Sequence, residues 1–163
     1  MAIKHFLPGD FNGDGIADIV IADRMLFQYQ IFFGPDIDSV NIVDSDVTIH
    51  GTEDVLNGNY TIKAWDHDAD GSDELALLNL NDESRTVYLF NVPDQGEIYP
   101  GDAVATIHST ARNFTFQNIY TRGDINHDGV ADLIWSSAYD DIMNLPGTSE
   151  QRIKAGRADV IYG

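Results

Sequence analysis

Three copies of one short acidic loop restrict what this chain can fold into. The copies are Asp10–Asp18, Asp66–Glu74 and Asp124–Asp132, so their first residues are 56 and 58 positions apart. In each copy an oxygen-bearing side chain stands at the first, third, fifth and ninth places, with glycine at the sixth. A regular spacing of this size is typical of repeat proteins. We therefore treat the chain as three repeats, each built around one loop.

The oxygen-bearing residues predict a Ca²⁺ site in each loop, about three ions per chain. Ca²⁺ takes about six to eight oxygen ligands and tolerates irregular geometry, and glycine supplies the left-handed turn that folds a loop around the ion. A polar turn between strands is the simpler alternative, but such a turn needs no acid at its ninth place. The expected ligands are the first, third, fifth, seventh and ninth residues of the loops: Asp10, Asn12, Asp14, Ile16, Asp18, Asp66, Asp68, Asp70, Ser72, Glu74, Asp124, Asn126, Asp128, Val130 and Asp132.

The residues beyond the loops exclude two other kinds of calcium site. An EF-hand requires a carboxylate at the twelfth place of its loop, and here that place holds Ile21, Leu77 and Trp135. A paired-loop cellulosomal docking module fails at the same place, and the chain has no helix-like flanks around the loops.

Short apolar runs around each loop predict an all-β fold. One run precedes each loop, a second follows it directly, and an aromatic-rich run comes farther on; a fourth recurs twice. They are too short for helices and are bounded by turn residues, which is typical of strands. The predicted strands are Ile3–Leu7, Ile19–Ala22, Tyr29–Phe33, Val47–His50, Tyr60–Trp65, Leu75–Leu78, Thr86–Phe90, Ala105–His108, Phe114–Tyr120, Leu133–Trp135 and Ala158–Tyr162.

About four antiparallel strands per repeat is the composition of a β-propeller blade. The expected architecture is a single propeller segment over residues 1–163, with about three blades in units of approximately 1–34, 35–91 and 92–163. The sequence also resembles the FG-GAP repeat family, found in the head of integrin α-subunits. The resemblance covers essentially the whole chain and rests on Gly9–Ile19, Ile31–Pro35, Gly123–Trp135 and Gly156–Gly163.

The resemblance implies a propeller with Ca²⁺ held in a β-hairpin loop of each blade, and a role in extracellular recognition or adhesion. The second repeat departs from the pattern, with Trp65 before the loop where the others have glycine and Glu74 at its end where they have Asp. The family's Gly-Ala-Pro element is also missing, and its places are taken by Ala22-Asp23, Asn79-Leu80 and Ser137-Ala138.

The charge balance excludes several classes of partner. With 27 acidic against 9 basic residues and a net charge of −18, the chain is poorly suited to nucleic acid or anionic membranes, because phosphate binding needs Lys and Arg. It contains no cysteine, hence no disulfide framework or thiol chemistry. We find no signal peptide and no apolar stretch long enough to span a bilayer. The expected location is extracellular or at the cell surface.

Catalytic and adhesion motifs give no competing function. His50 and His108 occupy equivalent places in two repeats, which indicates a structural role, and His67 and His127 lie in the loops at places where we expect side chains to point away from the ion. We find no nucleophile elbow, phosphate loop or zinc spacing, so we expect no enzyme activity. Arg122-Gly123-Asp124 spells a tripeptide that adhesion receptors recognise, but Asp124 is already an expected metal ligand.

These observations favour a recognition module for a protein or glycan. Two alternatives stay open: a structural unit that assembles only with its own copies, and an accessory propeller of a polysaccharide-degrading enzyme. The expected binding loop is the insertion Ser136–Arg157, which carries Tyr139, Asp140 and Asp141; a long solvated hairpin is the plainer interpretation.

Ring closure is the remaining problem, because propellers have about four or more blades and this chain holds about three. The element equivalent to Val47–His50 is also absent once. Either the chain is a piece of a larger propeller, or copies assemble. We expect a homodimer that closes a six-bladed ring, with Met1–Leu7 of one copy beside the blade that ends at Gly163 of the other.

Overall fold

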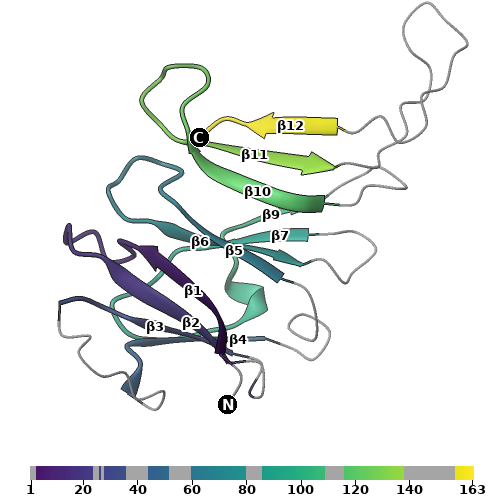
Figure 1. Cartoon of the computed structure of the whole chain (residues 1–163). Coiled ribbons are helices and arrows are strands. Elements are labelled where there is room, and N and C mark those ends of the chain that lie inside the picture. The colour runs from purple at the N-terminus through teal and green to yellow at the C-terminus, as the bar shows by residue number, and fades with distance from the viewer. Residues whose placement is uncertain are drawn as a thin grey trace, which may run out of the picture.

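Three β-sheets stacked one on another make up the structure, a computed structural model (Figure 1). It describes residues 3–23, 26, 28–35, 44–51, 60–79, 86–108, 116–137 and 157–163. Within these ranges the fold is all-β, as the sequence predicts, with a short 3₁₀ turn at Pro100–Asp102. No helix of the described residues is long and apolar enough to cross a membrane.

The first sheet contains five strands in the order β1-β2-β3-β4-β8. Neighbours are antiparallel except for β8, which runs parallel to β4. The bounds are Ile3–Gly9 for β1, Asp18–Asp23 for β2, Gln28–Phe32 for β3, Val47–His50 for β4 and Gly96–Ile98 for β8.

The second and third sheets are antiparallel throughout, in the orders β5-β6-β7-β9 and β10-β11-β12. The second sheet consists of β5 (Tyr60–Trp65), β6 (Glu74–Asn79), β7 (Thr86–Phe90) and β9 (Ala105–His108). The third consists of β10 (Phe116–Gly123), β11 (Asp132–Ser137) and β12 (Arg157–Ile161). The third sheet has no fourth strand among the described residues, which agrees with the repeat element missing from the sequence.

Each predicted strand is present, with ends that differ by a few residues. Residues 114 and 115, predicted to begin β10, lie outside the described ranges, as do residues 138–156 of the insertion. Strand β8 was not predicted, because three residues that begin with glycine carry no strand signal. Val47–His50 pairs with β3 and β8 pairs with β4. The first sheet therefore takes its strands from residues 3–50 and 96–98, the second from residues 60–90 and 105–108, and the third from residues 116–161.

The middle sheet is buried on both faces, which explains its continuous apolar strands. Successive side chains of a strand point to opposite faces, so Leu75 and Leu77 pack toward the first sheet while Ala76 and Leu78 pack toward the third. All four are at most 2% exposed. One core layer therefore lies between the first and second sheets, and another between the second and third.

The two ends of the stack differ. In the second sheet the buried pair Ala76 and Leu89 faces the third sheet. The corresponding pair in the third sheet, Ile134 and Val160, has no sheet beyond it among the described residues, and Val160 is 37% exposed. We call this the open face of the third sheet. The outward face of the first sheet is instead covered, because Ile21 and Phe32 are buried there.

Candidate metal centre

The three acidic loops are three equivalent hairpin connections. In each, the residue before the loop pairs with the ninth residue, as Gly9 with Asp18, Trp65 with Glu74, and Gly123 with Asp132. They join the first and second strands of each sheet and lie on the same side of the stack (Figure 1). Because each loop is held at both ends by an antiparallel pair, its backbone is constrained by the sheet from which it projects.

The loops also share their backbone conformation. The sixth residue is a glycine in the left-handed region each time, with φ of 81°, 96° and 96° at Gly15, Gly71 and Gly129, as predicted. The fourth residue is left-handed as well, with φ of 71° at Gly13, 58° at Ala69 and 63° at His127. Left-handed backbone costs a non-glycine residue about 1–2 kcal/mol. No sequence pattern predicts this strain at the fourth place.

One hydrogen-bond pattern runs through the loops. The seventh residue's N–H donates to the fifth carboxylate at 2.8 Å each time, from Ile16, Ser72 and Val130. The fifth residue's N–H donates to the third side chain, at 3.1 Å to Asn12, 3.3 Å to Asp68 and 3.2 Å to Asn126. These bonds hold the side chains of the third and fifth residues against the loop backbone.

The first and third loops match in further detail. In both, the first Asp accepts hydrogen bonds from the N–H groups of the fifth and sixth residues, at 3.1 and 2.9 Å on Asp10 and at 3.2 and 3.0 Å on Asp124. The third residue, Asn, donates its side-chain N–H to the fifth Asp, at 3.2 Å from Asn12 and 2.6 Å from Asn126. Hydrogen bonds from the Val130 N–H and then the Asn126 side chain lower the pKa of Asp128.

The second loop lacks these bonds to its first Asp. Its Asp66 Oδ1 is buried and has no hydrogen-bond partner among the described residues. The third place is an acid here, and one carboxylate oxygen from each of Asp66, Asp68 and Asp70 lies within 4.8 Å of the others. Like charges this close repel one another, and a buried oxygen without a donor is costly. The geometry and charge of this loop are therefore suited to a divalent cation.

The ninth acid is buried in each loop, with Asp18 and Glu74 each 2% exposed and Asp132 0%. Each accepts a hydrogen bond from the N–H of the second loop residue, at 2.7 Å from Phe11, 3.0 Å from His67 and 2.6 Å from Ile125. Glu74, not Asp73, thus takes the place equivalent to Asp18 and Asp132.

In two repeats the ninth acid also holds the end of the third strand. Gly34 N–H donates to Asp18 at 2.9 Å and Gly163 N–H donates to Asp132 at 3.2 Å. Burial raises the pKa of the Asp18 carboxyl, while the N–H groups of Gly34 and Phe11 oppose that shift. The ninth acid therefore closes the loop onto the sheet by itself, before any ion is considered.

One expectation about the loop histidines is wrong. His67 does not point away from the loop interior: its Nδ1 lies 2.6 Å from Glu74 Oε2, and the imidazole and the carboxylates of Asp68 and Glu74 form a second close group of ligand atoms. The cause is the longer side chain of Glu74, which reaches the imidazole from the ninth place. His127, which stands at the fourth place of the third loop rather than the second, is exposed.

The loops contact one another along the same side of the stack. Asp10 N–H donates to Asp73 Oδ2 at 2.9 Å, and Asp73 N–H donates to the carbonyl of Asp10 at 2.6 Å. A Cβ added at Gly13 would lie 2.5 Å from Ser72 Oγ. The Trp65 indole N–H donates to the Ala131 carbonyl at 2.6 Å. These contacts join distant parts of the sequence, so the loop pattern alone did not reveal them.

Comparison with models of known protein families finds no match to this chain, and comparison with curated proteins finds no similar sequence. The geometry of the loops is therefore the main basis for assigning a function.

Proposed function

We propose that this chain is a Ca²⁺-binding segment of a β-propeller that serves as an extracellular recognition module. The observation that carries the metal assignment is the second loop, where Asp66 Oδ1 is buried without a donor beside two further carboxylates. Ca²⁺ is the fitting ion because the side chains at the first, third, fifth and ninth places all offer oxygen atoms as metal ligands. Ile16 and Val130, at the seventh place, offer only main-chain oxygens.

A bound ion would offset the repulsion among the carboxylates of each loop. The side chains at the first, third and fifth places would hold it, together with the carbonyl of the seventh residue and the ninth acid. Because the loops contact one another, ions there would also stiffen the side of the stack that they form. This supports a role for Ca²⁺ in stability, in a chain without cysteine.

The first test is the melting temperature with and without a chelator. An ion that binds only the native state adds RT ln(1 + [L]/Kd), about 2.7 kcal/mol per site at a hundredfold excess over Kd. Chelation should lower the melting temperature by many degrees, and millimolar Ca²⁺ should restore it. An identical melt under both conditions would remove the metal assignment for all three loops.

Single variants should then separate the sites. Asp14→Ala, Asp70→Ala and Asp128→Ala each remove the fifth ligand of one loop. Titration calorimetry should show one Ca²⁺ fewer per chain in each variant, with the other two sites unchanged. Loss of all sites from one substitution would mean that the loops bind as one unit rather than separately.

The propeller and its location form the second part of the proposal. Three stacked sheets, each with an equivalent hairpin loop, are the arrangement expected of successive blades in a β-propeller. The resemblance to FG-GAP repeats supports extracellular recognition of a protein or glycan. A binding role is proposed in preference to catalysis. A glycan array in Ca²⁺ buffer tests the glycan ligand, and a positive result would also favour recognition over a purely structural role.

The second candidate function is self-assembly, and the open face of the third sheet favours it. Ile134 and Val160 occupy the places at which Ala76 and Leu89 are buried in the preceding sheet. Two copies that pack through this face would form a homodimer. The six-bladed ring expected from the sequence would in addition require the first sheet of each copy, whose outward face is covered, to join the contact. An accessory propeller of a polysaccharide-degrading enzyme remains an alternative that no structural observation favours.

A further inference from the structure

The second loop departs from the other two at places that come together in space. Its second, third and ninth residues are His67, Asp68 and Glu74, where the first and third loops have an apolar residue, Asn and Asp. One ligand atom from each of these three side chains lies within 4.8 Å of the other two. The departures from the repeat pattern therefore form one group, in which an imidazole nitrogen joins two carboxylates.

The His67 imidazole is oriented by contacts on two sides. Its Nδ1 lies 2.6 Å from Glu74 Oε2, and its ring packs edge to face with the Trp65 indole, with the ring centroids 5.5 Å apart. Trp65 is 3% exposed, and its indole N–H donates to the carbonyl of Ala131. Trp65 is itself a departure from the pattern, because the other two loops follow a glycine. A fixed indole therefore supports the ring whose nitrogen faces Glu74.

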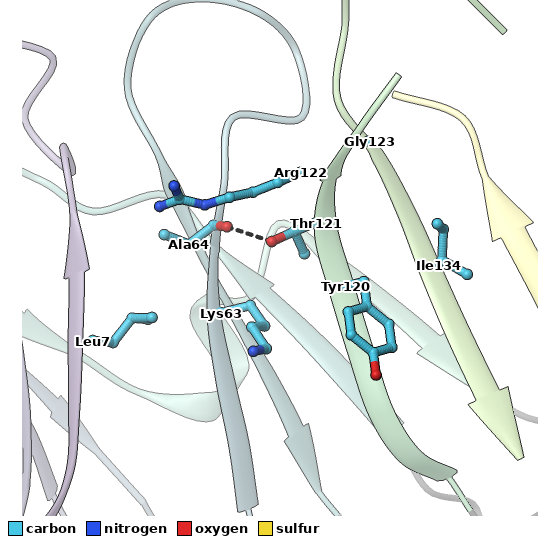
Figure 2. Close-up of a pocket in the computed structure, with 8 residues that line it drawn as sticks. All are labelled: Leu7, Lys63, Ala64, Tyr120, Thr121, Arg122, Gly123 and Ile134. Atoms are coloured by element: carbon cyan, nitrogen blue, oxygen red, sulfur yellow. Dashed lines mark hydrogen bonds between the residues drawn. The ribbon is translucent and has the colours of Figure 1, made fainter. Parts of the chain in front are cut away.

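The strand that leads into this loop is also fixed. Thr121 Oγ1 donates to the carbonyl of Ala64 at 2.7 Å, which ties the end of β5 to β10 of the third sheet (Figure 2). Glu74 begins β6, and its side chain is buried. The His67 side chain is 31% exposed, and Asp68 is exposed. The group thus has a buried carboxylate at its base and an open side through which an ion can enter.

A nitrogen ligand changes which ion the group suits. Ca²⁺ takes oxygen ligands, whereas imidazole suits Zn²⁺ and its neighbours among the transition metals. A neutral imidazole and two ionised carboxylates together match the charge of a divalent cation. Zn²⁺ binds His nitrogen and carboxylate oxygen at about 2.0–2.2 Å. An ion here would therefore replace the hydrogen bond between His67 and Glu74 with a metal bond to each side chain.

We propose that the second loop binds a divalent transition-metal ion of the Zn²⁺ class, with His67 Nδ1, Asp68 and Glu74 as its ligands. The proposal rests on the metal-binding role proposed above for the loops and names a different ion for one of them. Asp68 also belongs to the close group with Asp66 and Asp70, and Glu74 is an expected Ca²⁺ ligand. The two ions therefore compete for this loop.

The test is calorimetric titration of the chain with Zn²⁺, in buffers of increasing Ca²⁺ concentration. We expect one tight Zn²⁺ site per chain, whose apparent affinity falls as Ca²⁺ is raised, and NMR of the imidazole nitrogens should place the ion at His67 Nδ1. No Zn²⁺ binding, or nitrogen shifts confined to other histidines, would overturn the proposal. Ca²⁺ binding without Zn²⁺ binding would leave the function proposed above intact, whereas Zn²⁺ binding without Ca²⁺ binding would overturn that function alone.

Two matched histidine variants complete the experiment. His67→Asn removes the nitrogen ligand and should weaken Zn²⁺ binding at least about a hundredfold, because loss of an outer contact to a metal ligand alone costs about 10–100-fold. His127→Asn removes the exposed histidine of the third loop and should bind Zn²⁺ as the parent does. Melting curves of both variants check folding. Parent-like Zn²⁺ affinity in His67→Asn would show that the contact with Glu74 is structural only, and equal losses in both variants would contradict the assignment to the second loop.

Discussion

At the scale of single residues, the fourth place of the second and third loops holds a non-glycine residue in a strained, left-handed backbone conformation. Ala69 and His127 have φ of 58° and 63°, whereas the first loop has glycine there. The loop closes on both sides of this residue, through the hydrogen bond between the third and fifth residues and through the glycine at the sixth place. The left-handed backbone is therefore imposed on the side chain. The sequence predicted the glycines correctly but not this place, because Ala and His carry no left-handed signal.

Ala69→Gly should therefore stabilise the chain. Relief of left-handed strain, about 1–2 kcal/mol, outweighs the entropy that glycine loses on folding, about 0.5–1 kcal/mol, so we expect a gain of roughly 0.5–1 kcal/mol. Denaturant unfolding in Ca²⁺ buffer measures it. The control is Ala17→Gly, at an exposed loop position without positive φ, which should destabilise the chain. Destabilisation of similar size by both variants would show that Ala69 is not strained.

At the scale of elements, the hairpins were predicted well because their information is local. Oxygen-bearing side chains, glycine and the flanking apolar runs all lie within a few positions of each loop. What the sequence could not give is contact between elements. Strand β8 exists because β4 offers it an edge, the Asp10–Asp73 bridge joins two loops, and Thr121 reaches the Ala64 carbonyl only through the packing of β5 beside β10. Each depends on how whole sheets stack.

The two neighbouring acids of the second loop provide a prediction at this scale. Glu74 is buried at the ninth place and accepts from His67, while Asp73 joins the second loop to the first through Asp10. Glu74→Gln should weaken Ca²⁺ binding by that loop at least about tenfold, because ligand charge sets affinity. Asp73→Asn removes the same charge but should leave Ca²⁺ affinity within about threefold. Calorimetric titration that gave the reverse order would show that our register for this loop is wrong.

At the scale of the whole molecule, the stack is asymmetric. The first sheet's outward face is covered, with Ile21 and Phe32 buried, whereas the third sheet exposes Val160 and Tyr120 and ends in a strand without a fourth neighbour among the described residues. Soluble proteins avoid leaving both an apolar face and a strand edge uncovered. Another repeat or another copy would therefore pack at the end of the stack formed by the third sheet.

We predict that the chain forms a homodimer in solution, with Ca²⁺ favouring it. The net charge of −18 opposes association at low salt, and bound Ca²⁺ reduces that repulsion. Light scattering at high protein concentration should give twice the chain mass of 18.0 kDa in Ca²⁺, and less with a chelator. Val160→Lys places a charge on the open face and should yield monomer, whereas Val104→Lys, at another exposed valine, should not. A monomeric mass in Ca²⁺ would rule out assembly by copies, and a dimer unaffected by Val160→Lys would place the contact elsewhere.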